Sequence, residues 1–414
     1  VWGTMAQTFN FQNRNESTRF LPITSILNYF IYNSLKFNFN LYGALAFILL
    51  ISCSIALYLT IQKLINSYLL STLVSIMWLT NNLAYQSFTW IGALVPSMVA
   101  ALFFILGLYL LLLFNENKSN YYLLASLLLF TASLLSKEYG VFYVFPSIAL
   151  ILFFRNDKLN IIKRIIISTL FLIPLAVSFI LPRALYLMSG QSNFAPSINP
   201  GNRGDLIYNA FLLPAKSLFH TYFSSEKIHE FVYSISRTTF GNYTDGFIVH
   251  RIVGDAFSIL ISFYILLVIG LVLSISNQEN RKLILFSLFS FFASFAPFIV
   301  FKHIGPIIEP RFYILPAIFS SLLAILIIHS LASKLNIFRQ ISTILVASLL
   351  IVPNINGVKK MLAIDIKTGG YRRGIVNTIK EIKPYLGKNS VFYFYTDHTG
   401  FWEFQSGFGQ TLAV

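Results

Sequence analysis

A lysine and a glutamate, Lys137 and Glu138, lie side by side between two long apolar runs. Charged residues near membrane depth are costly and therefore point to function. Here the lysine could neutralise a phosphate group, and the carboxylate could position a hydroxyl group or a metal ion, or act as a base. A solvated helix turn with a weak Lys–Glu pair is the alternative. The very short connection between the two runs favours a polar hinge at the floor of a cavity.

Four further residues could bind a phosphorylated sugar. Arg311 and Tyr313 precede an apolar run, where the arginine could form a bidentate fork with phosphate and the tyrosine could add a hydrogen bond. Snorkelling of the side chain would equally account for Arg311. Arg19 precedes a short amphipathic segment, as either a phosphate ligand or a headgroup anchor. Trp90 could stack on a sugar ring, although a membrane-interface aromatic residue is the commoner role.

The composition favours a membrane over nucleic acid as the partner of this basic chain. The net charge is +15, yet only 11% of residues are charged and 56% are hydrophobic. A soluble domain carries roughly 25% charged residues. Basic residues at helix ends would meet anionic lipid headgroups, so we expect no nucleic acid. The single cysteine, Cys53, allows no internal disulfide, and no metal, Walker or dinucleotide motif is present.

Ten apolar runs have about the length that crosses a bilayer as a helix. They lack the strict alternation of barrel strands. The sequence therefore predicts an all-α, polytopic transmembrane bundle over residues 1–353, with an extracytoplasmic segment at 354–414. In that segment we expect a helix over 371–386 and a strand over 391–395, the start of a small α/β part. The ten predicted spans are 41–62, 66–85, 92–114, 120–136, 139–154, 163–181, 254–275, 283–301, 312–333 and 340–353.

Basic residues in the short loops predict the orientation. One set of loops holds ten of them, whereas the opposite set holds three, Lys137, Lys302 and Arg311. The positive-inside rule places the first set in the cytoplasm. Residues 1–40, a long loop over 182–253 and the tail are then outside, as are Lys137 and Arg311. A chain that begins outside calls for an earlier span, so we expect a natural start upstream of the first residue.

Two segments are amphipathic but too short and too polar to span. Residues 21–37 gather leucine, isoleucine and phenylalanine on one helical face, and residues 205–223 show a similar pattern. Such helices lie in the membrane interface. We expect the first to be an outer interfacial helix and the second an interfacial or lid helix.

Five segments carry a resemblance to a known family. Residues 19–24 resemble an R-P-L-T motif, residues 134–138 an L-L-S-K-E motif, and residues 309–316 a D/E-R-Y-x-Y-L-P motif with one proline inserted. Residues 40–42 and 89–92 resemble Y-H-L-x-N and W-I-x-G-R, but the family histidine and arginine are absent. In this order, the segments are similar to the GT-C superfamily of membrane glycosyltransferases. The closest likeness is to its PMT-like and TMTC-like O-mannosyltransferases and their bacterial relatives.

The resemblance implies an inverting transferase. It would move a sugar from a polyprenyl-phosphate donor to a protein or glycan acceptor at the outer face of the plasma membrane. A carboxylate would act as base, and cations from the protein or from a divalent metal would stabilise the leaving phosphate. In the family the base follows the first span, so we expect it upstream of Val1 and expect this chain alone to be inactive. Glu138 is the secondary candidate for the base.

Three other classes of function remain open from the sequence, and one of them is a non-catalytic membrane scaffold, which would leave the outer cavity unfilled by polar groups. An O-antigen-type polymerase or ligase also pairs many spans with a long basic outer loop, which residues 182–253 provide. The order of the 136–138 and 311–316 segments favours the transferase. A transporter or flippase for lipid-linked saccharides is a second alternative, but transporters tend to show internal repeats and midplane charges, and neither is evident here.

Overall fold

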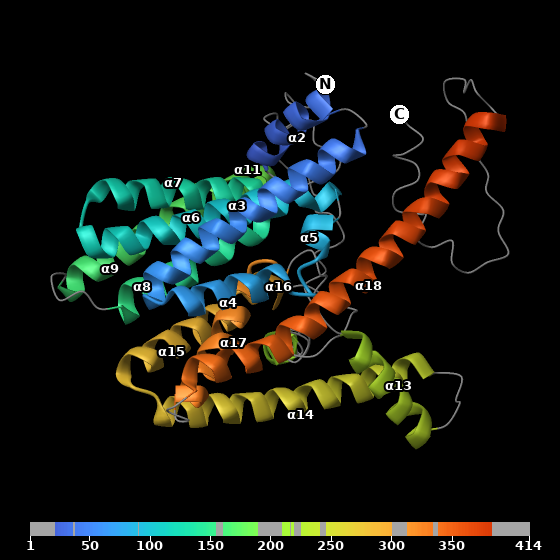
Figure 1. Ribbon diagram of the computed structural model, residues 1–414. Coiled ribbons are helices and arrows are strands. Elements are labelled where there is room, and N and C mark those ends of the chain that lie inside the picture. Colours follow the sequence, from blue (N-terminus) through green and yellow to red (C-terminus); the bar gives the residue numbers. More distant parts are fainter. Residues whose placement is uncertain are drawn as a thin grey trace. The chain divides into compact units, whose positions relative to one another are not determined.

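The computed structural model describes residues 21–35, 38–89, 91–154, 160–188, 209–215, 217–218, 225–240, 246–299, 313–333 and 338–382. These residues are almost all helical, and they include no strand (Figure 1). The all-α expectation is therefore confirmed for the described part of the chain. The predicted strand at 391–395 lies outside it. The chain divides into two compact units after Val358, close to the expected boundary at 353 but inside a continuous helix.

Five helices among the described residues are long and apolar enough to cross a membrane, which indicates a multi-pass membrane protein. Their exposed side chains fit a lipid solvent. Phe47 and Ile48 on one helix, and Phe263 and Leu271 on another, are more than half exposed. Large apolar surfaces of this kind are rare on soluble monomers. The five segments are Asn40–Ile65, Leu94–Asn117, Ile162–Ile180, Ala256–Ile275 and Arg339–Lys367.

Other predicted spans are shorter or divided in the structure. The 66–85 span contains helix α4 only over Tyr68–Leu79, followed by a turn and α5, Gln86–Thr89. The helix stops because the Asn81 side chain accepts a hydrogen bond from the Leu83 N–H at 2.9 Å, which offers the backbone a turn instead. The remaining apolar helices are α7 (Asn120–Ser136), α8 (Val144–Phe153), α15 (Gln278–Ala293), α16 (Ala296–Ile299) and α17 (Pro316–Ala332).

Helices also occupy part of the expected outer loop at 182–253. Helix α11 continues over Leu181–Met188, residues 209–215 are helical, and α13 covers Ser225–Phe240. Helix α13 packs on α14, Gly246–Ile275, where Phe231 and Phe257 place their ring centroids 5.0 Å apart. The described residues of the predicted lid are therefore helical as expected.

Helices α3 (Phe39–Ile65), α6 (Ile91–Asn117) and α7 form a packed group in the first unit, with α6 in contact with both α3 and α7 (Figure 1). Buried hydroxyl groups join their backbones. Ser126 donates to the Gly107 carbonyl and Ser133 to the Ala100 carbonyl, each at 2.8 Å. Small residues and interhelical hydrogen bonds are the usual means by which membrane helices approach closely. Phenylalanine rings from four elements fill the space between these helices and α17.

Helix α18 is one continuous helix over Arg339–Ile382, so the predicted span at 340–353 and most of the predicted helix at 371–386 belong to the same element. Within the first unit, Gly357 faces the buried side chain of Asn82. A Cβ atom at Gly357 would lie 3.0 Å from the Asn82 Cγ and Nδ2 atoms. The Asn82 side chain therefore leaves little room for a side chain at position 357.

Replacing Gly357 with alanine should lower the free energy of unfolding by about 1–3 kcal/mol, because it overpacks the Asn82 contact. Gly270→Ala is the matched control, since a Cβ there meets no atom within 4 Å. That control should be neutral or stabilising by up to about 1 kcal/mol through helix propensity. Thermal unfolding of both variants in detergent measures the difference, and equal unfolding midpoints would contradict the contact.

Candidate functional site

The helix breaks at Lys137 and Glu138, the segment for which a polar hinge was one of two interpretations and which is called the hinge below. Helix α7 ends at Ser136, and Lys137 adopts an extended backbone with φ −156° and ψ 137°. A 3₁₀ helix, η2, then runs over Glu138–Tyr143. The side chains of Lys137 and Glu138 are both half-buried. One cation and one carboxylate therefore stand at a break between helices, where neither is fully solvated.

Backbone hydrogen bonds define the hinge. The Lys137 N–H donates to the Ser133 carbonyl at 3.0 Å, and the Gly140 N–H donates to the Lys137 carbonyl at 2.9 Å. Gly140 is buried, and a Cβ atom there would lie 3.0 Å from the Ser133 oxygen. Only a residue without a side chain lets the 3₁₀ turn fold back this closely onto the end of α7.

The amphipathic segment near the N-terminus reaches this hinge. It forms helix α2, Pro22–Leu35, which packs on α6 and α7. The hydroxyl of Thr24, a buried residue, donates to the Ser136 carbonyl. The last carbonyls of a helix have no partner within the helix, so this hydroxyl from another element satisfies one of them. Two segments 112 residues apart are thereby joined at the hinge.

Replacing Thr24 with valine should destabilise the protein by about 0.5–1.5 kcal/mol, because it removes the hydroxyl donor while keeping the side-chain shape. Thr24→Ser keeps a hydroxyl and should retain most of this stability. Thermal unfolding in detergent compares the two variants. A serine variant as unstable as the valine variant would show that the methyl group, rather than the hydrogen bond, holds α2.

A second set of contacts extends from η2 toward α17. Helix α16 packs on η2, and the neighbouring ring of Phe295 lies 6.1 Å from the ring of Tyr313. Tyr313 is fully buried, and its hydroxyl donates to the Ser217 carbonyl at 3.0 Å. Tyr313 thus joins the described part of the 205–223 segment to the start of α17. In this structure its hydroxyl proton is donated to the Ser217 carbonyl, whereas the sequence analysis considers donation to a phosphate.

The three other predicted site residues, Arg19, Trp90 and Arg311, lie outside the described residues. Of the predicted set, the structure therefore describes Lys137 and Glu138 together at the hinge, and Tyr313 in contact with the lid segment.

The described residues do not offer a metal site. No three His, Cys, Asp or Glu side chains in that part of the chain come together as ligands. Glu138 is the carboxylate at the hinge, and a single carboxylate does not make a divalent-metal site. The positive charge that the described hinge itself can offer to an anion is Lys137.

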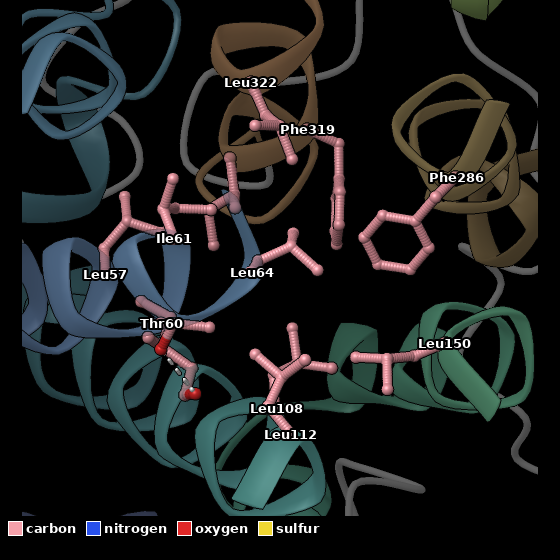
Figure 2. Close-up of a pocket in the computed structure, with 12 residues that line it drawn as sticks. Leu57, Thr60, Ile61, Leu64, Leu108, Leu112, Leu150, Phe286, Phe319 and Leu322 are labelled. Carbon is pink, nitrogen blue, oxygen red and sulfur yellow. Dashed lines mark hydrogen bonds between the residues drawn. The ribbon is translucent and has the colours of Figure 1, made fainter. Parts of the chain in front are cut away.

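A small cavity among α3, α6, α8, α15 and α17 is unsuited to a polar substrate. Its volume is about 20 Å³, room for a single water molecule at most. The Thr60 hydroxyl is the polar group in its lining (Figure 2). It donates to the Ala56 carbonyl at 2.7 Å and lies 3.3 Å from the Ile105 carbonyl. Leu57, Ile61, Leu108, Phe286 and Phe319 line much of the rest. This cavity is an apolar packing gap.

Of the two structural residues of the hinge, Gly140 and Thr24, only Gly140 carries a signal in the sequence. Gly140 follows Lys137 closely, and a glycine after a polar break is typical of a tight turn. Thr24 has no such signal, since threonine is common in helices near their start.

Comparison with known proteins finds no matching family model, no similar curated protein and no similar solved structure.

Proposed function

We propose that this protein transfers a sugar from a polyprenyl-phosphate donor to a protein or glycan acceptor at the membrane, by an inverting mechanism. The observation that carries the proposal is the hinge, where the half-buried side chains of Lys137 and Glu138 follow the end of α7 and α2 bonds the last residue of α7. A cation in a partly desolvated position acts on a phosphate more strongly than it would in water. A donor with a lipid tail can reach such a position from the bilayer.

In this proposal Lys137 binds the phosphate of the donor and stabilises the negative charge that develops on it as the glycosidic bond breaks. Glu138 orients the acceptor hydroxyl, or removes its proton if no other carboxylate reaches it. An interfacial position of α2, as its amphipathic sequence predicts, would fit this arrangement, because a helix at headgroup level would border a lipid-linked substrate. Arg19 and Arg311 would supply further positive charge to the same phosphate.

The test uses the product of the complete reading frame in membrane vesicles. Polyprenyl-phosphate mannose and polyprenyl-phosphate glucose, each with a radiolabelled sugar, are supplied with membrane protein and glycan as acceptors. We expect label to pass from the lipid to an acceptor only when the protein is present. Movement of labelled lipid across the bilayer without transfer would indicate a flippase instead. Absence of label on every acceptor with both donors would reject the transferase.

A further inference from the structure

Tyr143, the last residue of η2, inserts its hydroxyl group into the backbone of a neighbouring membrane helix. The hydroxyl donates to the Phe171 carbonyl at 2.6 Å. Phe171 lies at an opening in that helix, between one helical segment that ends at Leu170 and another that begins at Leu172. The tyrosine hydroxyl therefore bonds the backbone at a break between two helical segments.

The sequence of that helix explains the opening. Helix α9 covers Ile161–Leu170 and α10 covers Leu172–Leu175, and a π-helical turn follows over Ala176–Ile180. Pro174 has no N–H, so it cannot donate to the Leu170 carbonyl, and its ring crowds the preceding turn. The break falls within the candidate span Ile162–Ile180. Backbone groups exposed at such a break need an internal partner, because lipid offers none.

Packing holds the tyrosine ring in place. Tyr143 is fully buried and stacks on Phe130, with centroids 4.7 Å apart and planes 16° apart. Phe130 in turn contacts the ring of Phe171 at 5.8 Å. A 3₁₀ helix rises about 2 Å per residue, so Glu138 begins only about 10 Å along the chain axis from Tyr143. Fixing Tyr143 therefore limits where Lys137 and Glu138 can stand.

We propose that Tyr143 is a positioning residue. Its hydroxyl attaches the turn that bears Lys137 and Glu138 to the Phe171 carbonyl, in the break between α9 and α10. The opposite end of the turn is held by Thr24 at Ser136. The turn is thus fixed at both ends by side-chain hydroxyls that reach backbone groups of other elements. The role of the turn in sugar transfer rests on the proposed function, whereas its attachment to the neighbouring helices does not.

Amide hydrogen exchange on the 414-residue chain in lipid nanodiscs tests the attachment directly. Tyr143→Phe removes only the hydroxyl, and we expect exchange over 137–143 and over 171–180 to become roughly tenfold faster, the factor that corresponds to about 1.4 kcal/mol. Tyr121→Phe is the matched control, because Tyr121 is 72% exposed on α7. It should leave both regions unchanged.

A double variant separates positioning from simple stability. In Tyr143→Phe/Pro174→Ala the membrane helix regains an N–H at position 174 and can close its own hydrogen bonds. We expect the unfolding midpoint to recover while exchange over 137–143 stays fast, and Pro174→Ala alone to keep that turn protected. Unchanged exchange in Tyr143→Phe, or a double variant in which the turn is protected again, would overturn the inference.

The transfer assay on the complete reading frame is read separately. Tyr143→Phe should lower kcat about tenfold with little change in KM, because Lys137 and Glu138 remain present but less well placed. The double variant should stay slow despite its recovered stability. If Tyr143 had a purely structural role, the transfer rate would recover together with the stability. Absence of transfer by the wild-type protein would reject the proposed function, while the exchange experiment would still decide the role of Tyr143.

Discussion

Replacing Lys137 with methionine is expected to slow sugar transfer by about 10²–10³-fold, the usual cost of removing one group that stabilises developing charge. Methionine matches the apolar stem of lysine and removes only the ammonium group. The effect should be large because Lys137 is half-buried at the end of α7, where solvent screens its charge incompletely. Among the described hinge residues, Lys137 carries the positive charge, and no metal-ligand cluster is described there to replace it.

Initial rates with labelled polyprenyl-phosphate sugar measure this effect on the product of the complete reading frame. Lys137→Arg keeps the charge but changes its geometry, so we expect a rate between those of the wild type and the methionine variant. Lys163→Met is the matched control, because Lys163 is exposed in the first turn of α9, away from the hinge. Equal rates for Lys137→Met and Lys163→Met would remove Lys137 from the site.

Replacing Gly107 with alanine should lower the free energy of unfolding by about 2–3 kcal/mol, toward the upper part of the range for overpacked cores. A Cβ atom at Gly107 would lie 2.8 Å from the Phe130 Cε1 atom. The Phe130 ring cannot move aside easily, because it is fully buried and rings of Phe104, Tyr143 and Phe171 surround it. The added methyl group must therefore push α6 and α7 apart.

Thermal and denaturant unfolding in detergent measure this loss. Gly43→Ala is the control within a membrane helix, since a Cβ atom there meets nothing within 4 Å. The double variant Gly107→Ala/Phe130→Leu should be less unstable than the sum of its two single variants, because the smaller leucine leaves room for the methyl group. Simple additivity of the two changes would show that the Phe130 contact is not the cause.

The Gly107 contact also bears on the hinge. Phe130 is the ring on which Tyr143 stacks, and Tyr143 ends the 3₁₀ turn that carries Glu138. Displacement of Phe130 would therefore shift the turn as well as loosen the bundle. Gly107→Ala should consequently reduce transfer more than Gly357→Ala at comparable stability, because Gly357 contacts Asn82 rather than the ring cluster.

Local information in the sequence was enough for the helical membrane class and for the break at the hinge. Hydrophobicity over about twenty residues decides whether a helix prefers lipid, and this is a property of each segment by itself. The polar residues at 136–138 interrupt such a pattern, and residues 22–35 show an amphipathic pattern in its place. The ends of helices were harder to predict. Helix α4 stops early through an Asn81 side-chain bond, and α17 begins only at Pro316.

Only the tertiary structure decided which segments meet. Thr24 bonds Ser136, Tyr143 bonds Phe171, and the Trp78 indole donates to the Ile314 carbonyl 236 residues away. In each case the acceptor is a backbone carbonyl, which every residue possesses, so the sequence carries no mark of the partner. The sequence determined the helical, multi-pass membrane class. The three-dimensional packing determined that two hydroxyl groups form hydrogen bonds at the two ends of the turn that bears Lys137 and Glu138.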